Sequence, residues 1–214
     1  MHAYASDSID RRIVPWIIAV VAIAVVFLYH VFAGTFRFAL PWWCEAPSIM
    51  LVYGLVHWGY DQKLWRQQPF GLLLSQIPNC AGTWFGQIES TYDGGTTAEG
   101  MLVIHQTWKK MLVEFRTDGS TSYSRMASLN VTPGASQGLI YEYSNDPRAT
   151  ATAEMHAHRG FAFLRLSVDG QQLEGDYYTG RDRTSQGTLH LRLVSREELT
   201  IQQARQEYQK TVKQ

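Results

Sequence analysis

The sequence predicts two N-terminal transmembrane α-helices, followed by an all-β eight-stranded antiparallel barrel and a short C-terminal helix. Apolar residues gather in the first 60 positions, whereas alternating segments broken by Gly, Asn, Asp and Pro begin near Cys80. Polar helix formers occupy the end of the chain. We therefore expect a membrane region over 1–67, a ligand-binding barrel over 78–194 and a helix over 195–214.

The first hydrophobic segment, residues 13–34, carries no formal charge over 22 positions. As a helix it spans roughly 30 Å, the thickness of a bilayer core. Pro15 falls in its first turn, where a missing N–H does little harm. Because Arg11 and Arg12 precede the segment, a cleaved signal peptide is the competing interpretation. The length of the segment and the second hydrophobic stretch behind it favour a retained helix.

The second hydrophobic segment, residues 46–60, is shorter, about 22 Å as a helix. Trp and Tyr flank it on both sides, as at membrane interfaces. A helix lying in the interface or packed on the soluble domain is the alternative to a second span. Arg and Lys lie before the first segment and after the second, which places both termini and the barrel in the cytoplasm by the positive-inside rule.

Eight segments with alternating character follow, and turn residues separate most of them. Short antiparallel strands in this number close into a small barrel that is filled by side chains or holds one small ligand. The expected strands are GTWFGQIE, MLVIHQTW, KMLVEFRT, SYSRMASLNV, GLIYEYSN, HAHRGFAFLRLSV, QLEGDYYTGR and GTLHLRLV.

Strand parity then predicts which side chains face the lumen. In residues 173–181 the set that begins with Leu173 opposes an acidic set, so it is assigned to the interior although it ends in Tyr, Thr and Arg. The same reasoning in the other strands yields a polar interior end. The candidate ligand-binding residues are Gln106, Trp108, Ser122, Ser124, Tyr141, Tyr143, Asn145, His158, Tyr177, Thr179 and Arg181.

Buried polar groups of this kind need partners, because an unpaired one costs a few kcal/mol. They either satisfy one another or are satisfied by a polar ligand. Aromatic rings and an Arg suit a nucleotide, and they equally suit a haem or a carboxylated lipid. Composition alone does not choose among these ligands.

Other classes of function have weaker signals. Equal counts of 19 basic and 19 acidic residues disfavour a DNA or RNA polymer as partner. No Walker, G-x-S-x-G or zinc-type spacing is present, so neither an enzyme nor a metal or cofactor site is expected, with EMHAH at 154–158 as the weak metal alternative. The two cysteines, Cys44 and Cys80, are expected to stay unpaired.

The C-terminal segment opens with Ser195, and Glu198 follows three residues later. This spacing predicts a capping box at the start of a helix. The helix has mostly polar residues, so we expect a solvated element that contacts the barrel through Leu199, Ile201 and Tyr208.

Two hydrophobic segments precede a barrel that contains IHQTW, STSYS, LIYEYSNDP, HRG and LEGDYYTGRDRTSQGTLHL. In this order the chain resembles the two-transmembrane, β-strand-rich effectors of bacterial CBASS antiphage signalling, from residue 13 to residue 194. The resemblance implies a cytosolic barrel that binds a cyclic dinucleotide made by a nucleotidyltransferase. It further implies that the ligand drives homo-oligomerisation and disruption of the cell inner membrane, which is abortive infection.

Two other hypotheses compete with this interpretation. Gly-x-Trp at 82–84 also occurs at the start of lipocalin barrels, where Trp plugs the base. The alternative function is therefore a membrane-tethered, lipocalin-like carrier of a lipid or haem. A solid barrel with a purely structural role is the third.

Overall fold

The computed structural model describes residues 1–35, 45–67, 75–91, 95–134, 137–147, 158–180 and 185–212. They form two compact units. We call Ser8–Gln76 the helical unit, and Met1–Asp7 together with Ile77–Gln214 the barrel unit.

The helical unit contains α1 (Asp10–Thr35), α2 (Glu45–Gln62) and the short 3-10 helix η2 (Leu64–Arg66). α1 packs against α2. Its buried side chains recur every four residues, at Val14, Ile18, Ala22 and Val26, as a stripe along one side of a helix must.

Large apolar side chains elsewhere on α1 are exposed, including Trp16, Val20 and Phe27. An apolar exposed surface suits a helix surrounded by lipid. By length and hydropathy, Asp10–Ala33 meets the requirement for a membrane span, and it is the one helix of the described residues that does. The expectation of two spans is therefore supported for the first helix only.

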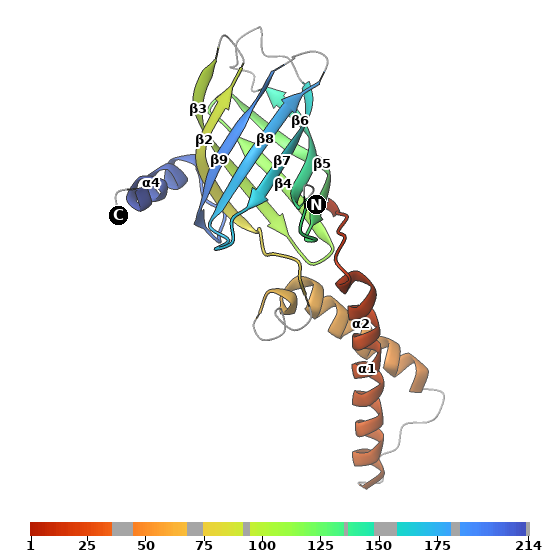
Figure 1. The fold of residues 1–214 in the computed structure, drawn as a ribbon. Coiled ribbons are helices and arrows are strands. Elements are labelled where there is room, and N and C mark those ends of the chain that lie inside the picture. The colour runs from red at the N-terminus through yellow and green to blue at the C-terminus, as the bar shows by residue number, and fades with distance from the viewer. Residues whose placement is uncertain are drawn as a thin grey trace. The chain divides into compact units, whose positions relative to one another are not determined.

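The barrel unit is built on eight strands, as the sequence predicted (Figure 1). They are β2 (Gly82–Ser90), β3 (Thr96–Gln106), β4 (Lys110–Arg116), β5 (Ser120–Asn130), β6 (Gly138–Pro147), β7 (His158–Leu166), β8 (Gln172–Thr179) and β9 (Gln186–Ser195). Their order is β4-β3-β2-β9-β8-β7-β6-β5, every neighbouring pair is antiparallel, and a β4–β5 pairing closes the barrel. The N-terminal strand β1 (His2–Ala3) adds to the free edge of β4.

The closed end of the barrel, which we call the base, lies where β2 begins and β3 ends. Trp84 is fully buried there, and its Nε1–H donates to the carbonyl of Cys80 at 2.9 Å. Trp108 and Tyr4 are buried as well. The opposite end, where β2 ends and β3 begins, is the mouth.

The C-terminal helix α4 (Ile201–Val212) begins later than predicted, because Ser195 is still part of β9. Its capping box is Thr200 with Gln203: Gln203 N–H donates to the Thr200 hydroxyl at 3.3 Å, and Thr200 N–H donates to Gln203 Oε1 at 3.0 Å. The prediction of a box at Ser195 and Glu198 was wrong, since the same spacing recurs five residues on.

α4 contacts the outer face of the barrel beside β2 and β9 (Figure 1), and most of its other side chains are exposed or half-buried, as expected for a solvated helix. Phe85, Met101 and Val103 point outward and are buried with Ala204 of α4. The predicted contacts through Leu199, Ile201 and Tyr208 are all present.

Candidate functional site: the barrel cavity

The parity assignment holds on the strands that carry most of the predicted site. On β8 Tyr177 and Thr179 line the lumen, while Tyr178 is 52% exposed on the outer wall. On β6 Tyr141, Tyr143 and Asn145 face inward. The polar end of each inner face therefore lies at the mouth, around a cavity.

The cavity has a volume of about 200 Å³ and receives side chains from all eight strands. Seven of the predicted residues line it: Ser122, Tyr141, Tyr143, Asn145, His158, Tyr177 and Thr179. Ten further lining residues are Ile88, Ser90, Thr96, Ala98, Phe115, Thr117, Ser120, Ala162, Ser185 and Leu189.

Asn145 presents a buried, unsatisfied donor to the cavity. Its side chain is buried, with 3% of the residue exposed, and its Oδ1 accepts the hydroxyl of Ser122 at 2.8 Å. Its Nδ2 has no hydrogen-bond partner. Native structures leave few buried polar atoms unpaired, and each such atom calls for an explanation. A hydrogen-bond acceptor on a ligand in the cavity would explain the unpaired Nδ2.

Aromatic side chains form a continuous row along β6 and β7. The rings of Tyr141 and Tyr143 lie 6.2 Å apart, and those of Tyr143 and His158 lie 6.4 Å apart in an edge-to-face arrangement. Burial raises the pKa of Tyr141, so its phenol stays neutral at physiological pH. The row presents flat surfaces on which a planar group can stack.

Two glycines make room for aromatic rings that line the cavity. A Cβ at Gly160 would lie 2.4 Å from the Tyr143 hydroxyl, and one at Gly187 would lie 2.7 Å from Cε1 of Tyr177. An added Cβ would also clash with the backbone carbonyl of Tyr178 at Gly160 and with that of Glu89 at Gly187, so a larger residue fits at neither position. Ala162 is a third small residue on the inner wall.

Thr179 lines the cavity, but its hydroxyl is already engaged. It donates to the Ser185 carbonyl at 3.0 Å and accepts the Ser185 N–H at 2.9 Å. These bonds tie the end of β8 to the start of β9. The predicted residue Arg181 lies between them, outside the described residues, and no Lys or Arg occurs among the described residues that line the cavity.

Three predicted residues do not line the cavity. β3 ends at Gln106, so Trp108 lies in the β3–β4 turn at the base. Gln106 faces inward, but its Oε1 accepts the Cys80 N–H at 2.8 Å and its Nε2 donates to the Pro78 carbonyl at 3.1 Å. Ser124 accepts the N–H of Val113 at 2.9 Å, at a point where the β5–β6 register shifts. These side chains serve the barrel itself.

Several lining residues were missed because parity was not carried far enough. Ile88 and Ser90 continue the inner face of Trp84, and Ala98 and Thr96 extend β3 beyond the predicted start of its strand. The alternation was readable on β2. The extra length of β3 was obscured by its polar and small residues, which resemble a loop.

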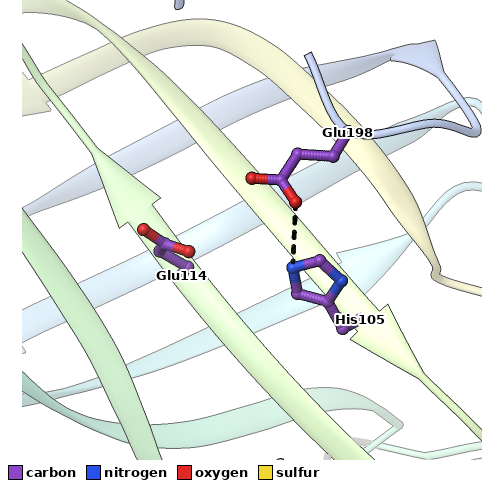
Figure 2. Close-up of side chains that lie close together, drawn as sticks. All are labelled: His105, Glu114 and Glu198. Carbon is purple, nitrogen blue, oxygen red and sulfur yellow. Dashed lines mark ion pairs between the residues drawn. The ribbon is translucent and has the colours of Figure 1, made fainter. Parts of the chain in front are cut away.

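The sequence singled out EMHAH as a weak metal candidate, and Glu154 and His156 lie outside the described residues. The structure instead gathers His105, Glu114 and Glu198 on the outer wall (Figure 2). His105 Nε2 lies 3.6 Å from Glu198. Arg116 already binds both carboxylates, at 2.6 Å to Glu114 and 2.8 Å to Glu198.

The Arg116 guanidinium thus already neutralises both carboxylates, and its pKa is raised chiefly by the bond to Glu114. This cluster holds the segment before α4 against β4. It provides no sign of a metal centre.

A larger hollow of about 830 Å³ lies beside the mouth. It is open to solvent, and Glu89 and Asp176 line it. Carboxylates disfavour an anionic ligand, so the lumen is the better candidate site.

Comparison with known proteins assigns this barrel to a family. Residues 75–193 match the family model described as Cap15, cyclic dinucleotide receptor domain. The chain belongs to this family. The match runs from the segment before β2 into β9 and includes all the described residues of the cavity.

A curated relative is CD-NTase-associated protein 15 from Yersinia aleksiciae, which is 36% identical over 136 residues. The aligned part is 64% of this chain and 64% of the relative. The membership of the barrel supports the predicted resemblance to CBASS effectors, and it favours a nucleotide over the lipid or haem of the lipocalin-like alternative.

Proposed function

We propose that the protein is a membrane-anchored effector of antiphage defence whose barrel binds a cyclic dinucleotide. The observation that carries the proposal is the mouth cavity, where Asn145 Nδ2 is buried and unpartnered beside a row of aromatic rings. Family membership supplies the ligand class. No step of chemistry is required of the barrel, so we propose a receptor rather than an enzyme, and no cofactor or metal beyond the activating ligand.

The mouth offers each part of such a ligand a partner. Tyr143 and Tyr177 can stack on a base, a contact worth about 1–3 kcal/mol. The Asn145 amide donates to a base carbonyl or a phosphate oxygen. Arg181 follows β8 in the sequence, and we propose that its guanidinium pairs with a phosphate.

The helices anchor the receptor. α1 has the composition of a span, and we propose α2 as a second, shorter span that returns the chain to the same side. The positive charges at 11–12 and at 63 and 66 favour cytoplasmic ends on both helices, hence a cytoplasmic barrel at the cell inner membrane.

We propose that the bound messenger favours a homo-oligomer whose helices assemble and disrupt the membrane. A ligand shifts such an equilibrium only by its differential affinity for the two states. Small residues allow helices to approach closely in lipid, and Ala19, Ala24 and Gly54 are candidates. The name of the Yersinia relative associates that protein with a CD-NTase; a nucleotidyltransferase is accordingly the proposed source of the messenger here.

Calorimetric titration of the full chain in lipid nanodiscs with a panel of cyclic dinucleotides tests the proposal. We expect one of them to bind, the linear dinucleotide of the same bases to bind more weakly, and Arg181→Ala to lose more than about tenfold in affinity. Binding by none of the panel would refute the proposed function. A lipid or haem that co-purifies and occupies the lumen would favour the carrier hypothesis instead.

A further inference from the structure

The barrel wall has one weak seam, between β4 and β5. Only three register pairs join these strands, from Glu114–Tyr123 to Arg116–Thr121. Six pairs join β3 to β4, and ten join β5 to β6. Towards the base β4 and β5 separate, which would leave two unpaired strand edges.

The N-terminal segment fills this gap. On one side His2 pairs with Met111, and Ala3 pairs with Lys110, in antiparallel register on β4. On the other side Ala5 N–H donates to the Ala127 carbonyl at 3.0 Å on β5. The segment therefore lies within the wall and bridges the two strands.

Side chains secure the segment along its length. His2 Nε2 lies 2.7 Å from the Ser124 hydroxyl, and Tyr4 is only 6% exposed at the base. The Asp7 carboxylate accepts the N–H groups of Val131 and Thr132 at 2.7 and 3.1 Å, which lowers the pKa of Asp7. We call Met1–Asp7 the seam segment.

The ligand cavity reaches the same seam. Phe115 and Ser122 are the central pair of the three-pair ladder, and both line the cavity. Ser122 also bonds to Asn145, the residue with the unpartnered amide. A ligand in the cavity thus touches the weakest joint of the wall.

The size of the cavity indicates how a ligand would act on the β4–β5 ladder. Sites for ligands of drug or cofactor size usually occupy about 300–1,000 Å³, against about 200 Å³ here. A ligand of that size seated wholly within the lumen would widen it, and we expect the shortest ladder to open first because it has the fewest hydrogen bonds to strain.

We propose that the seam segment is a releasable strand that reports occupancy of the cavity to the membrane helix. Filling the cavity spreads β4 from β5, the seam segment loses its pairing, and the chain leading into α1 is freed. The sequence continues from Asp7 through Ser8 and Ile9 to α1 at Asp10, so no intervening domain absorbs the change. This inference rests on the proposed function for the identity of the ligand, but its mechanism depends only on the barrel.

A disulfide across the seam measures the pairing directly. Ala3→Cys and Lys110→Cys place thiols on exposed register partners, whose Cα atoms in an antiparallel pair lie within the reach of a disulfide. The full chain in nanodiscs, with Cys44→Ser, should crosslink within one chain when no ligand is present. The single-cysteine variants are the controls, and failure to crosslink would overturn the proposal.

A bound cyclic dinucleotide should slow crosslinking by about fivefold or more, the lower range of measured allosteric coupling. Oxidised protein should still bind the ligand but release no dye from vesicles, and reduction should restore release. Ligand that binds without changing the crosslinking rate, or oxidised protein that still leaks, would overturn the proposal and leave the receptor function intact.

A series that fills the cavity from within tests the mechanism without any ligand. Ala162→Val, Ala162→Leu and Ala162→Phe add increasing volume on the inner face of β7, and Ser144→Phe on the outer face of β6 is the matched control. We expect crosslinking to slow progressively along the series in those variants whose melting curves stay cooperative. The mildest variant, Ala162→Val, keeps the test valid if the largest misfolds. An unchanged crosslinking rate along the series would contradict the seam proposal. If crosslinking slows along the series although no cyclic dinucleotide binds the protein, the seam proposal holds and the proposed function is wrong.

Discussion

The base and the mouth of the barrel each carry an inward amide side chain, but the two amides differ in how far their hydrogen bonds are satisfied. At the base, Gln106 has both ends of its amide occupied, by Cys80, Pro78 and Tyr4, and Trp84 fills the lumen. At the mouth, Asn145 has only one end of its amide occupied, and the lumen is hollow.

The difference shows that an inward polar residue is not by itself a ligand contact. Where neighbouring backbone groups satisfy the side chain, it stabilises the fold. Where one polar atom stays unpaired beside free volume, the site is prepared for something that the chain does not contain.

The largest expected effect is a loss of stability on removal of the side chain that fills the base. Trp84→Ala removes a fully buried side chain and its bond to Cys80, so the free energy of unfolding should fall by about 3–5 kcal/mol. Denaturant unfolding of the full chain in detergent measures this change. Trp84→Phe, which keeps most of the volume, should lose less, and equal losses would show that Trp84 does not plug the lumen.

The next effect sharpens the role of the mouth. Tyr143→Leu removes a stacking surface worth about 1–3 kcal/mol, equivalent to a loss of about 5- to 150-fold in ligand affinity. Tyr123→Leu, on the outer wall with 45% of Tyr123 exposed, is the matched control and should bind normally. Titration calorimetry separates the two variants, and an equal effect from both would argue against stacking in the lumen.

A smaller effect isolates the unpaired amide. Asn145→Ala deletes one hydrogen bond to the ligand, about 1 kcal/mol, and should weaken binding by about fivefold. It also removes the buried bond to Ser122, so the free energy of unfolding should fall by about 1–3 kcal/mol. Asn130→Ala, at the base end of β5, removes a comparable amide that bonds to Ser128. Normal affinity in the Asn145 variant would mean that its Nδ2 never meets the ligand.

The smallest expected effect concerns the access of a thiol reagent to the base and to the mouth. Burial raises the pKa of Cys80 from its ordinary value of 9.0 to about 12, so the thiol stays neutral and unreactive at pH 8. The folded state holds this proton more tightly than the unfolded state. Its contribution to stability is therefore present below pH 9 and is lost as the pH rises toward 12.

With Cys44→Ser as background, a thiol reagent should label Cys80 only after unfolding. A cysteine introduced at the mouth by Ser120→Cys should react in the folded protein. Rapid labelling of Cys80 at pH 8 would show that the base is open.

Much of the barrel was predictable from local pattern. Eight alternating segments gave eight strands, and parity placed Tyr177 and Thr179 inside because β8 has no bulge. Parity could not show which polar residues are satisfied by the backbone, since the bonds of Gln106 come from residues 26 and 28 positions away in sequence. Nor could it place Trp108, because the end of β3 is set by its turn.

Two further features depend on contacts between distant parts of the chain. The seam segment lies between β4 and β5 through pairings more than 100 residues apart in sequence, which no local pattern reveals. The capping box was misplaced because Ser195 was still needed by the β2–β9 ladder. In both cases tertiary pairing decided between locally equivalent choices.

The location of the bound messenger tests the central claim most directly. A photoreactive cyclic dinucleotide, crosslinked to the full chain in nanodiscs and mapped by peptide mass spectrometry, should label the inner faces of β6, β7 and β8 around Tyr143, His158 and Tyr177. Excess unmodified ligand should abolish this labelling. Labels confined to the outer wall or to the base around Trp84 would contradict the account.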